Sequence, residues 1–119
     1  LDLFAGSGAL GFEALSRGAA QVTMVDHQRP VCHRLRENCE LLGTTQINIV
    51  CSGALTYLRQ TFDQFDIIFI DPPYNTLLAT QTFNLLDRQT TTTPDGVIYV
   101  ESGTHKEPLV LPSGWEIFR

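Results

Sequence analysis

A short acidic, proline-rich segment, Asp71-Pro72-Pro73-Tyr74, directly follows an apolar run of strand length at residues 65–70. Both prolines have a fixed φ and no backbone N–H, and each holds the residue before it in an extended conformation. The segment is therefore stiff, and it fixes where the Asp71 carboxylate and the Pro72 carbonyl point. The plain alternative is a strand that ends in a proline-stiffened turn.

These groups could activate a planar exocyclic nitrogen of a nucleobase. Such a nitrogen is a poor nucleophile because its lone pair is delocalised into the ring. Hydrogen bonds from its two N–H groups to the Asp71 carboxylate and the Pro72 carbonyl would favour a tetrahedral nitrogen with a localised lone pair. Tyr74 could stack on the base, a contact worth roughly 1–3 kcal/mol. The segment therefore predicts group transfer to nitrogen with much of the rate supplied by positioning, on a base that has left its stack.

A second candidate site lies near the start of the chain, where the pattern Gly6-x-Gly8-x-x-Gly11 separates a strand-like run from a helix-like run. Glycines let the backbone turn tightly and let a ligand approach the main chain, and a helix N-terminus favours negative charge. Asp26 ends the next predicted strand, where a carboxylate can accept hydrogen bonds from a ribose diol. The alternative is a tight turn plus a surface acid. Together the two features predict a cofactor that contains adenosine.

The glycine loop and Asp26 alone fit both a nicotinamide dinucleotide and S-adenosylmethionine. Asp2 favours the second, since its carboxylate could face the cationic end of an amino-acid-bearing cofactor and would repel a pyrophosphate. The segment at 71–74 also has a task in methyl transfer to nitrogen and none in hydride transfer. We therefore predict a methyltransferase that uses S-adenosylmethionine, with a nicotinamide-dependent oxidoreductase as the alternative class.

Strand-like and helix-like runs alternate along the chain, which predicts an α/β fold with a mostly parallel sheet and helices on both faces. The predicted strands are residues 1–4, 21–26, 47–51, 65–70 and 97–101, and the predicted helices are about 10–17, 29–42, 54–60 and 77–86. Parallel sheets bind ligands at the carboxyl ends of their strands, and the candidate site residues follow those ends. Residues 90–96 are predicted to be a solvated loop, and a sixth strand could begin at Trp115.

The composition is that of one globular domain of 119 residues, 43% of them hydrophobic. No apolar run approaches the about 20 residues of a membrane span, and no secretory signal opens the chain. The net charge of −5 is ordinary for a cytoplasmic domain. It argues against a nucleic-acid footprint within these residues, since such surfaces are usually basic.

The three cysteines, Cys32, Cys39 and Cys51, form no C-x-x-C pair, which predicts free thiols in a reducing compartment. Cys32 and Cys39 fall on one face of the predicted helix at 29–42, together with Leu35 and Leu42. This spacing indicates core packing rather than reactivity. No metal site is predicted, because the histidines have no metal-ligand spacing.

Four blocks of the sequence resemble the RsmD-type methyltransferases: LDLFAGSGALG at 1–11, EALSRGA at 13–19, FDIIFIDPPY at 65–74 and IYVES at 98–102. The resemblance runs nearly end to end. It implies a Rossmann-like class I fold that transfers methyl from S-adenosylmethionine to the N2 amine of a guanine in 16S ribosomal RNA. Other amino-methyltransferases share Asp-Pro-Pro-Tyr, whereas the first and last blocks are more particular to this family.

The resemblance also implies roles for individual residues. Asp2, Gly6 and Gly8 would bind the methionine side of the cofactor, with Ser7 in the same loop, and Asp26 would bind its ribose. The transfer itself would be carried by Asp71, Pro72, Pro73 and Tyr74.

The adenine end of the site departs from the family. After the third strand the family has an Asp or Asn that accepts a hydrogen bond from the adenine amine, but this chain has Gly53. The Ala54 N–H and Ser52 could hold the adenine instead. His27 could pack against the adenine ring, or it could be a plain loop residue.

The implied partner is ribosomal RNA, free or within an assembling small subunit, in the cytoplasm and without membrane association, with the oligomeric state left open. The family has a basic N-terminal segment and a final strand pair that these residues lack, so the sequence predicts a single methyltransferase domain over 1–119, truncated at both ends. Alternatives are methylation of another planar nitrogen, in DNA adenine or a protein glutamine, and a cofactor-binding module without catalysis, in keeping with Gly53.

Overall fold

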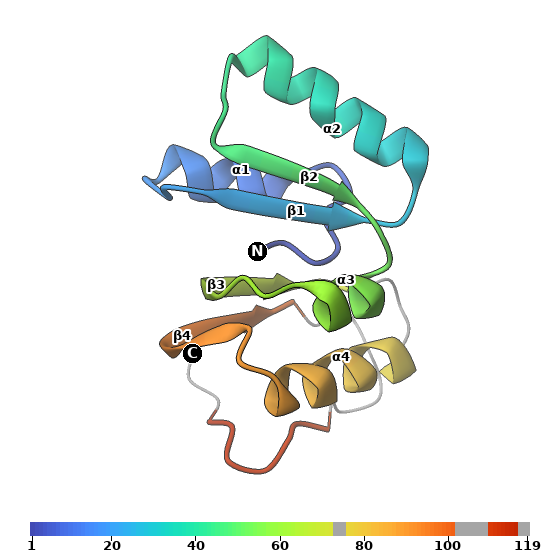
Figure 1. Ribbon diagram of the computed structural model, residues 1–119, viewed down its shortest axis with the longest axis vertical. Helices are drawn as coiled ribbons and strands as arrows, with labels where there is room; N and C mark the ends of the chain where they lie inside the picture. The colour runs from blue at the N-terminus through green and yellow to red at the C-terminus, as the bar shows by residue number, and fades with distance from the viewer. Residues whose placement is uncertain (73–75, 102–109, 117–119) are drawn as a thin grey trace.

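The computed structural model describes residues 1–72, 76–101 and 110–116. Helices and strands alternate along them, so the predicted α/β fold is confirmed (Figure 1). The elements are α1 (Ala9–Ser16), β1 (Val22–Asp26), α2 (Arg29–Leu42), β2 (Ile47–Cys51), α3 (Ala54–Gln60), β3 (Phe65–Ile70), α4 (Thr76–Arg88) and β4 (Thr92–Val100). The bounds of α2, β2, α3 and β3 are those predicted from the sequence. Within this part of the chain, no helix has the length and apolarity needed to cross a membrane.

The strands form one parallel layer around the first residues of the chain (Figure 1). β1 pairs with β2, and β3 pairs with β4. Asp2 forms parallel bridges to Met24 of β1 and to Phe69 of β3, so residues 1–4 join the two pairs. The order is therefore β2, β1, residues 1–4, β3, β4, and its switch point lies at residues 1–4, where such sheets bind ligands. The predicted first strand is only a bridge, because the chain turns into the glycine loop after Ala5.

Two apolar cores lie on opposite faces of this layer. Side chains alternate between the faces along a strand, so Val25 and Met24, which are adjacent in β1, belong to different cores. One core packs Leu1, Leu3, Val25, Ile68 and Ile70 against α3 and α4, and the other packs Ala5, Val22 and Met24 against α1 and α2. Helices therefore cover both faces, as the sequence predicted.

β4 begins earlier than the sequence predicted. Residues 92–96 belong to this strand rather than to a solvated loop, and Thr91 before them is buried. The register between β3 and β4 shifts between Phe65 and Ile67. A bulge at this point accommodates Pro94, which has no N–H to donate to the ladder. Pairing with β3 therefore outweighs the turn-forming preference of these residues.

The predicted inward face of α2 is confirmed for Cys32, Leu35 and Cys39. Leu42 was predicted on the same face but is exposed. It is the last residue of the helix, next to the left-handed Gly43 that ends it. The core contribution of α2 therefore stops one turn earlier than the spacing predicted.

Trp115 packs against the α4 core, with its ring edge-on to Phe83 at a centroid distance of 5.7 Å. Its indole N–H donates a hydrogen bond to the Asp87 carboxylate (3.0 Å). Trp115 and Glu116 are not in a strand. The rest of the predicted sixth strand, at 117–118, lies outside the described residues.

Candidate functional site

A cavity of about 370 Å³ lies at the carboxyl ends of the strands, next to the switch point. Its volume is within the range of small-molecule sites, roughly 300–1,000 Å³. The residues around it come from the first segment, the end of β1, the β2–α3 connection and the first turns of α3 and α4. They are Leu3, Phe4, Asp26, His27, Ser52, Gly53, Ala54, Leu55, Thr56, Arg59 and Leu78.

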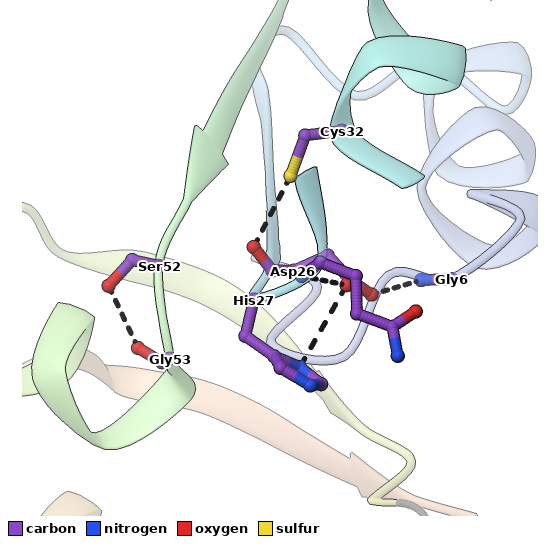
Figure 2. A network of polar contacts seen from close by, with 7 residues as sticks. Gly6, Asp26, His27, Cys32, Ser52 and Gly53 are labelled. Carbon is purple, nitrogen blue, oxygen red and sulfur yellow. Dashed lines mark hydrogen bonds and ion pairs between the residues drawn. The ribbon is translucent and has the colours of Figure 1, made fainter. Parts of the chain in front are cut away.

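Asp26 organises one wall of this cavity (Figure 2). Its Oδ2 accepts a hydrogen bond from the Gly6 N–H (3.0 Å), and its Oδ1 accepts one from the Gln28 N–H (2.9 Å). The carboxylate therefore ties the glycine loop to the end of β1. Because each carboxylate oxygen accepts two hydrogen bonds, both oxygens can still accept one from a ligand. His27 lies beside it, with Nδ1 3.9 Å from Asp26 Oδ1 and the ring mostly exposed.

The glycine loop needs glycine at Gly6 and Gly8, where φ is +54° and +84°. These left-handed conformations cost other L-residues roughly 1–2 kcal/mol. A Cβ at Gly8 would also lie 2.6 Å from Phe12 and 2.7 Å from Leu35, whereas one at Gly6 would meet nothing within 4 Å. Gly8 is therefore fixed by the packing behind the loop, and Gly6 leaves open space beside its main chain. Ser7 is exposed between them, and its hydroxyl accepts a hydrogen bond from the Ala9 N–H (3.4 Å).

Asp2 carries a buried carboxylate at the switch point. Its side chain is almost inaccessible to solvent, and Oδ1 has no hydrogen-bond partner among the described residues. Burial raises the pKa of this carboxyl to about 6, and the charges of Asp71 and Asp26 act in the same direction. A hydrogen bond from the Phe4 backbone lowers the pKa and so opposes this rise. Buried polar groups without a partner are rare because they are costly. The unpaired oxygen therefore makes Asp2 a candidate functional residue.

Three carboxylates thus act on one edge of the sheet, from Asp2, Asp26 and Asp71. They do not belong to a metal-ligand cluster, since the described part of the chain has no group of three or more such ligands. A cofactor with a sulfonium and an ammonium group fits this negative edge, whereas a pyrophosphate would be repelled. The apolar side chains of Phe4, Leu55 and Leu78 complete the cavity. The residues present therefore fit S-adenosylmethionine and do not fit a nicotinamide dinucleotide.

The adenine end of the predicted site is built around Gly53. Its φ of −65° and ψ of 148° suit any residue, and a Cβ added there would meet only the Thr56 Oγ1, at 3.8 Å. The Ser52 hydroxyl donates a hydrogen bond to the Gly53 carbonyl (3.0 Å), so its proton is already engaged (Figure 2). A side chain would therefore fit at position 53. Its Cβ would be in ordinary van der Waals contact with the Thr56 hydroxyl.

The structure brings most of the predicted site residues to one edge. Asp26, His27, Gly53 and Ala54 line the cavity, and Gly6 is bonded to Asp26. Asp71 is exposed directly after β3, with Pro72 half-buried behind it. Pro73 and Tyr74, which were predicted to take part in the transfer, lie outside the described residues.

Several cavity residues were not predicted from the sequence: Leu3, Phe4, Leu55, Thr56, Arg59 and Leu78. In the structure Tyr57 and Leu58 form the buried face of α3. Leu55 and Arg59 are four residues apart and so share a different face of the helix. α3 begins shortly after the end of β2, and this position in the sequence was the signal that one face of the helix borders the ligand edge of the sheet.

This arrangement of sheet, glycine loop and acidic second strand end is the Rossmann-like class I fold of the S-adenosylmethionine-dependent methyltransferases. The sequence profile of a family described as conserved hypothetical protein 95 matches residues 1–119. The chain belongs to this family, the RsmD-type methyltransferases, which confirms the predicted resemblance. S-adenosylmethionine is the methyl donor of the class, as predicted.

Individual relatives agree with this assignment. Ribosomal RNA small subunit methyltransferase D of Haemophilus influenzae is 39% identical over an alignment of 123 positions that covers 100% of this chain and 63% of the relative. The protein of the same name from Escherichia coli K12 is 39% identical over 119 residues, 100% of this chain and 60% of the relative. The solved structure of the protein yhhF from Escherichia coli superposes with a TM-score of 0.92 at 38% identity, covering 99% of this chain and 67% of that one. The chain thus spans about three fifths of the length of these curated relatives.

Proposed function

We propose that residues 1–119 form a single methyltransferase domain that transfers the methyl group of S-adenosylmethionine to the N2 amine of a guanine in 16S ribosomal RNA. The observation that carries this proposal is the position of Asp71, which directly follows β3. Asp2, beside the glycine loop, forms a parallel bridge to Phe69 of the same strand. A cofactor site and an amine-binding segment would therefore meet at the switch point. The names of the relatives support ribosomal RNA of the small subunit as the substrate.

The cofactor would be held by groups that the fold already orients. When bound, S-adenosylmethionine supplies an electrophilic methyl group on a sulfonium centre. The free Oδ1 of Asp2 would balance the positive charge of the methionine end, next to Gly6 and Gly8. Asp26 would accept hydrogen bonds from the ribose hydroxyls while it keeps its bonds to Gly6 and Gln28.

The acceptor amine would be held by Asp71 and Pro72. The Asp71 carboxylate and the Pro72 carbonyl can each accept one N–H of a planar amine, which localises its lone pair. Asp71 is exposed, so a proton passed to this carboxylate can leave to water. Stacking of the base on Tyr74 stays a prediction from the sequence. The choice of guanine over adenine rests on the resemblance to the family, because the segment itself requires only a planar nitrogen.

Product mapping tests this proposal. Ribosomal RNA from cells with and without the gene is digested to nucleosides, and N2-methylguanosine is quantified by mass spectrometry. We expect one N2-methylguanosine of the small-subunit RNA to disappear without the gene. If N2-methylguanosine is unchanged and a methyladenine is lost instead, the proposal that the target base is guanine is wrong.

Complementation with variants assigns the role of Asp71. Asp71→Ala should restore no methylation, while the purified variant still binds S-adenosylhomocysteine. Asp63→Ala is the matched control, because Asp63 is an exposed acid before the other end of β3, and it should restore methylation fully. Full methylation by Asp71→Ala would show that this carboxylate is not part of the transfer site.

The partner would be ribosomal RNA, free or in an assembling small subunit, which makes the cytoplasm the proposed location. Subunits at successive stages of assembly, offered to the purified protein with labelled cofactor, separate free RNA from particles as the substrate.

A further inference from the structure

Two cysteines flank the main chain of Asp26. Cys51 ends β2 and is the register partner of Asp26 in the parallel ladder. Cys32 lies in the first turn of α2, and its thiol donates a hydrogen bond to the Asp26 carbonyl (3.3 Å; Figure 2). The Ser52 N–H, next to Cys51, donates to the same carbonyl (2.9 Å). Side chains alternate between the two faces of the sheet along β2, so Cys51 lies on the same face as Ile49, which packs against the core under α1 and α2. The two cysteines therefore lie on the same face of the sheet, on either side of the Asp26 main chain.

The two thiols differ in their access to solvent. Cys51 is exposed, whereas the Cys32 side chain is completely buried. Burial, together with the neighbouring Cys51 thiol, raises the pKa of the Cys32 thiol to about 11. Cys32 therefore keeps its proton, and Cys51 is the member of the pair that a dissolved oxidant reaches. An accessible cysteine next to a second cysteine is the arrangement found in redox-sensing thiols.

Cys39 provides an internal comparison within the same helix. It is buried seven residues further along α2, and burial alone raises the pKa of its thiol. The three cysteines thus comprise one pair and one core residue.

We propose that Cys51 and Cys32 form an oxidisable thiol pair that closes to an intramolecular disulfide beside the cofactor site. A peroxide first oxidises Cys51: an S–O bond forms, the O–O bond breaks, and one water leaves. The sulfur of Cys32 then attacks the sulfur of Cys51, the S–O bond breaks, and the released hydroxide takes the Cys32 proton to give a second water. Two thiols and one peroxide give one disulfide and two waters.

The disulfide would act on the site through Asp26. It removes the hydrogen bond from the Cys32 thiol to the Asp26 carbonyl and ties the start of α2 to the end of β2. The Asp26 carboxylate holds the Gly6 N–H, so the glycine loop is coupled to the same residue. We expect oxidation to lower the affinity for S-adenosylhomocysteine at least threefold. This consequence rests on the proposed cofactor role of Asp26, whereas formation of the disulfide does not.

Disulfide mapping tests the pair. The reduced protein is treated with equimolar hydrogen peroxide, denatured in N-ethylmaleimide, and cleaved after Arg and Glu. Because Glu37 and Glu40 flank Cys39, this cleavage puts the three cysteines on separate peptides. We expect a linked Cys32–Cys51 peptide and an alkylated Cys39. A protein in which Cys32 stays fully alkylated after Cys51 has been oxidised would overturn the proposal.

Matched variants complete the test. Cys39→Ser should still form the linked peptide, whereas Cys51→Ser, which changes only an exposed side chain, should leave Cys32 and Cys39 alkylated. Calorimetry with S-adenosylhomocysteine is then compared before and after oxidation, in the wild type and in Cys51→Ser. A disulfide without loss of affinity would overturn the coupling to the site. A reduced protein that binds no S-adenosylhomocysteine would contradict the proposed function and leave the thiol pair standing.

Discussion

At the scale of single residues, Asp2 stands out because its carboxylate is buried without a partner for Oδ1 among the described residues. The pKa of this carboxyl is raised to about 6 in the folded chain from 3.8. The folded state therefore binds the proton more tightly than the unfolded state, and the stability falls as pH rises between about 4 and 6. Such a cost in the centre of a sheet is expected where a charge serves a ligand.

The first prediction concerns the stability of Asp2→Asn. One pKa unit corresponds to about 1.4 kcal/mol, so the charged carboxylate destabilises the fold by up to about 3 kcal/mol at pH 7. The amide removes the charge but leaves a buried polar group, so we expect a gain of about 1–2 kcal/mol in the free energy of unfolding at pH 7. The gain should shrink towards pH 4, where the wild-type carboxyl is protonated. Urea unfolding at both pH values measures it, and an equal gain at both would contradict the assigned pKa.

The second prediction concerns cofactor binding by the same residue. The ammonium group of S-adenosylhomocysteine favours the charged form of Asp2, so the affinity of the wild type should fall as pH drops through about 6. Asp2→Asn should bind about tenfold more weakly at pH 7.5, and its affinity should depend less on pH. Calorimetry across pH 5 to 8 checks both statements. A wild-type affinity that rises on acidification would show that Asp2 does not face the cation.

The third prediction restores a side chain at Gly53. The backbone at this position suits any residue, and a Cβ has room. Gly53→Asn adds an amide oxygen that can accept a hydrogen bond from the adenine amine, worth about 1 kcal/mol. We therefore expect S-adenosylhomocysteine to bind about fivefold more tightly, with Gly53→Ala as the control without an acceptor. An equal gain in both variants would show that the effect comes from the backbone rather than from adenine recognition.

At the scale of elements, the start of α1 depends on how the glycine loop packs. Gly6 and Gly8 share a left-handed backbone, but only Gly8 faces side chains of α1 and α2 at less than 3 Å from an added Cβ. We predict that Gly6→Ala costs about 1 kcal/mol. Gly8→Ala should cost about 2–4 kcal/mol, since overpacking adds to the strain. Urea unfolding measures both, and equal losses would mean that the packing behind Gly8 yields without cost.

The elements show how far local sequence determines this fold. The bounds of α2, β2, α3 and β3 were predicted because the apolar residues of α2 recur at helical spacing up to Gly43 and the strands are short apolar runs. The start of β4 was not predicted, because threonines, a proline and a glycine favour a turn locally. It follows from pairing with β3 and from a bulge, which depend on residues far apart in the chain.

In the candidate site, too, some residues were predicted from the sequence and others were not. Asp26 and Gly53 were predicted because a parallel sheet sends all strand ends to one edge. The cavity side chains of Thr56 and Arg59 were missed, because their face of α3 is set by how the helix docks on the sheet rather than by its own pattern. The lack of a partner for Asp2 Oδ1 among the described residues is likewise evident only from the folded structure.

At the scale of the whole molecule, the negative charge affects the two ligands of the proposed reaction differently, because the cofactor is cationic and the RNA is a polyanion. The chain has eight basic and thirteen acidic residues, a net charge of −5. Three carboxylates, from Asp2, Asp26 and Asp71, meet at the edge where the cofactor and the base would bind. Such a field attracts a small cation and repels a polyanion. Among the described residues that line the cavity, Arg59 is the one arginine or lysine.

The fifth prediction follows from this field. Residues 1–119 alone should bind S-adenosylhomocysteine but bind ribosomal RNA no more tightly than roughly 10⁻⁴ M at physiological salt, a typical limit of non-specific binding. The affinity for RNA should change little between 50 and 200 mM salt, since few phosphates are neutralised. Filter binding at both salt concentrations measures it, beside calorimetry with the cofactor product. Tight RNA binding that weakens steeply with salt would mean that these residues present a basic surface that their net charge conceals. In that case Arg59→Ala should reduce the salt dependence by about one phosphate contact, because that cation lies beside the site.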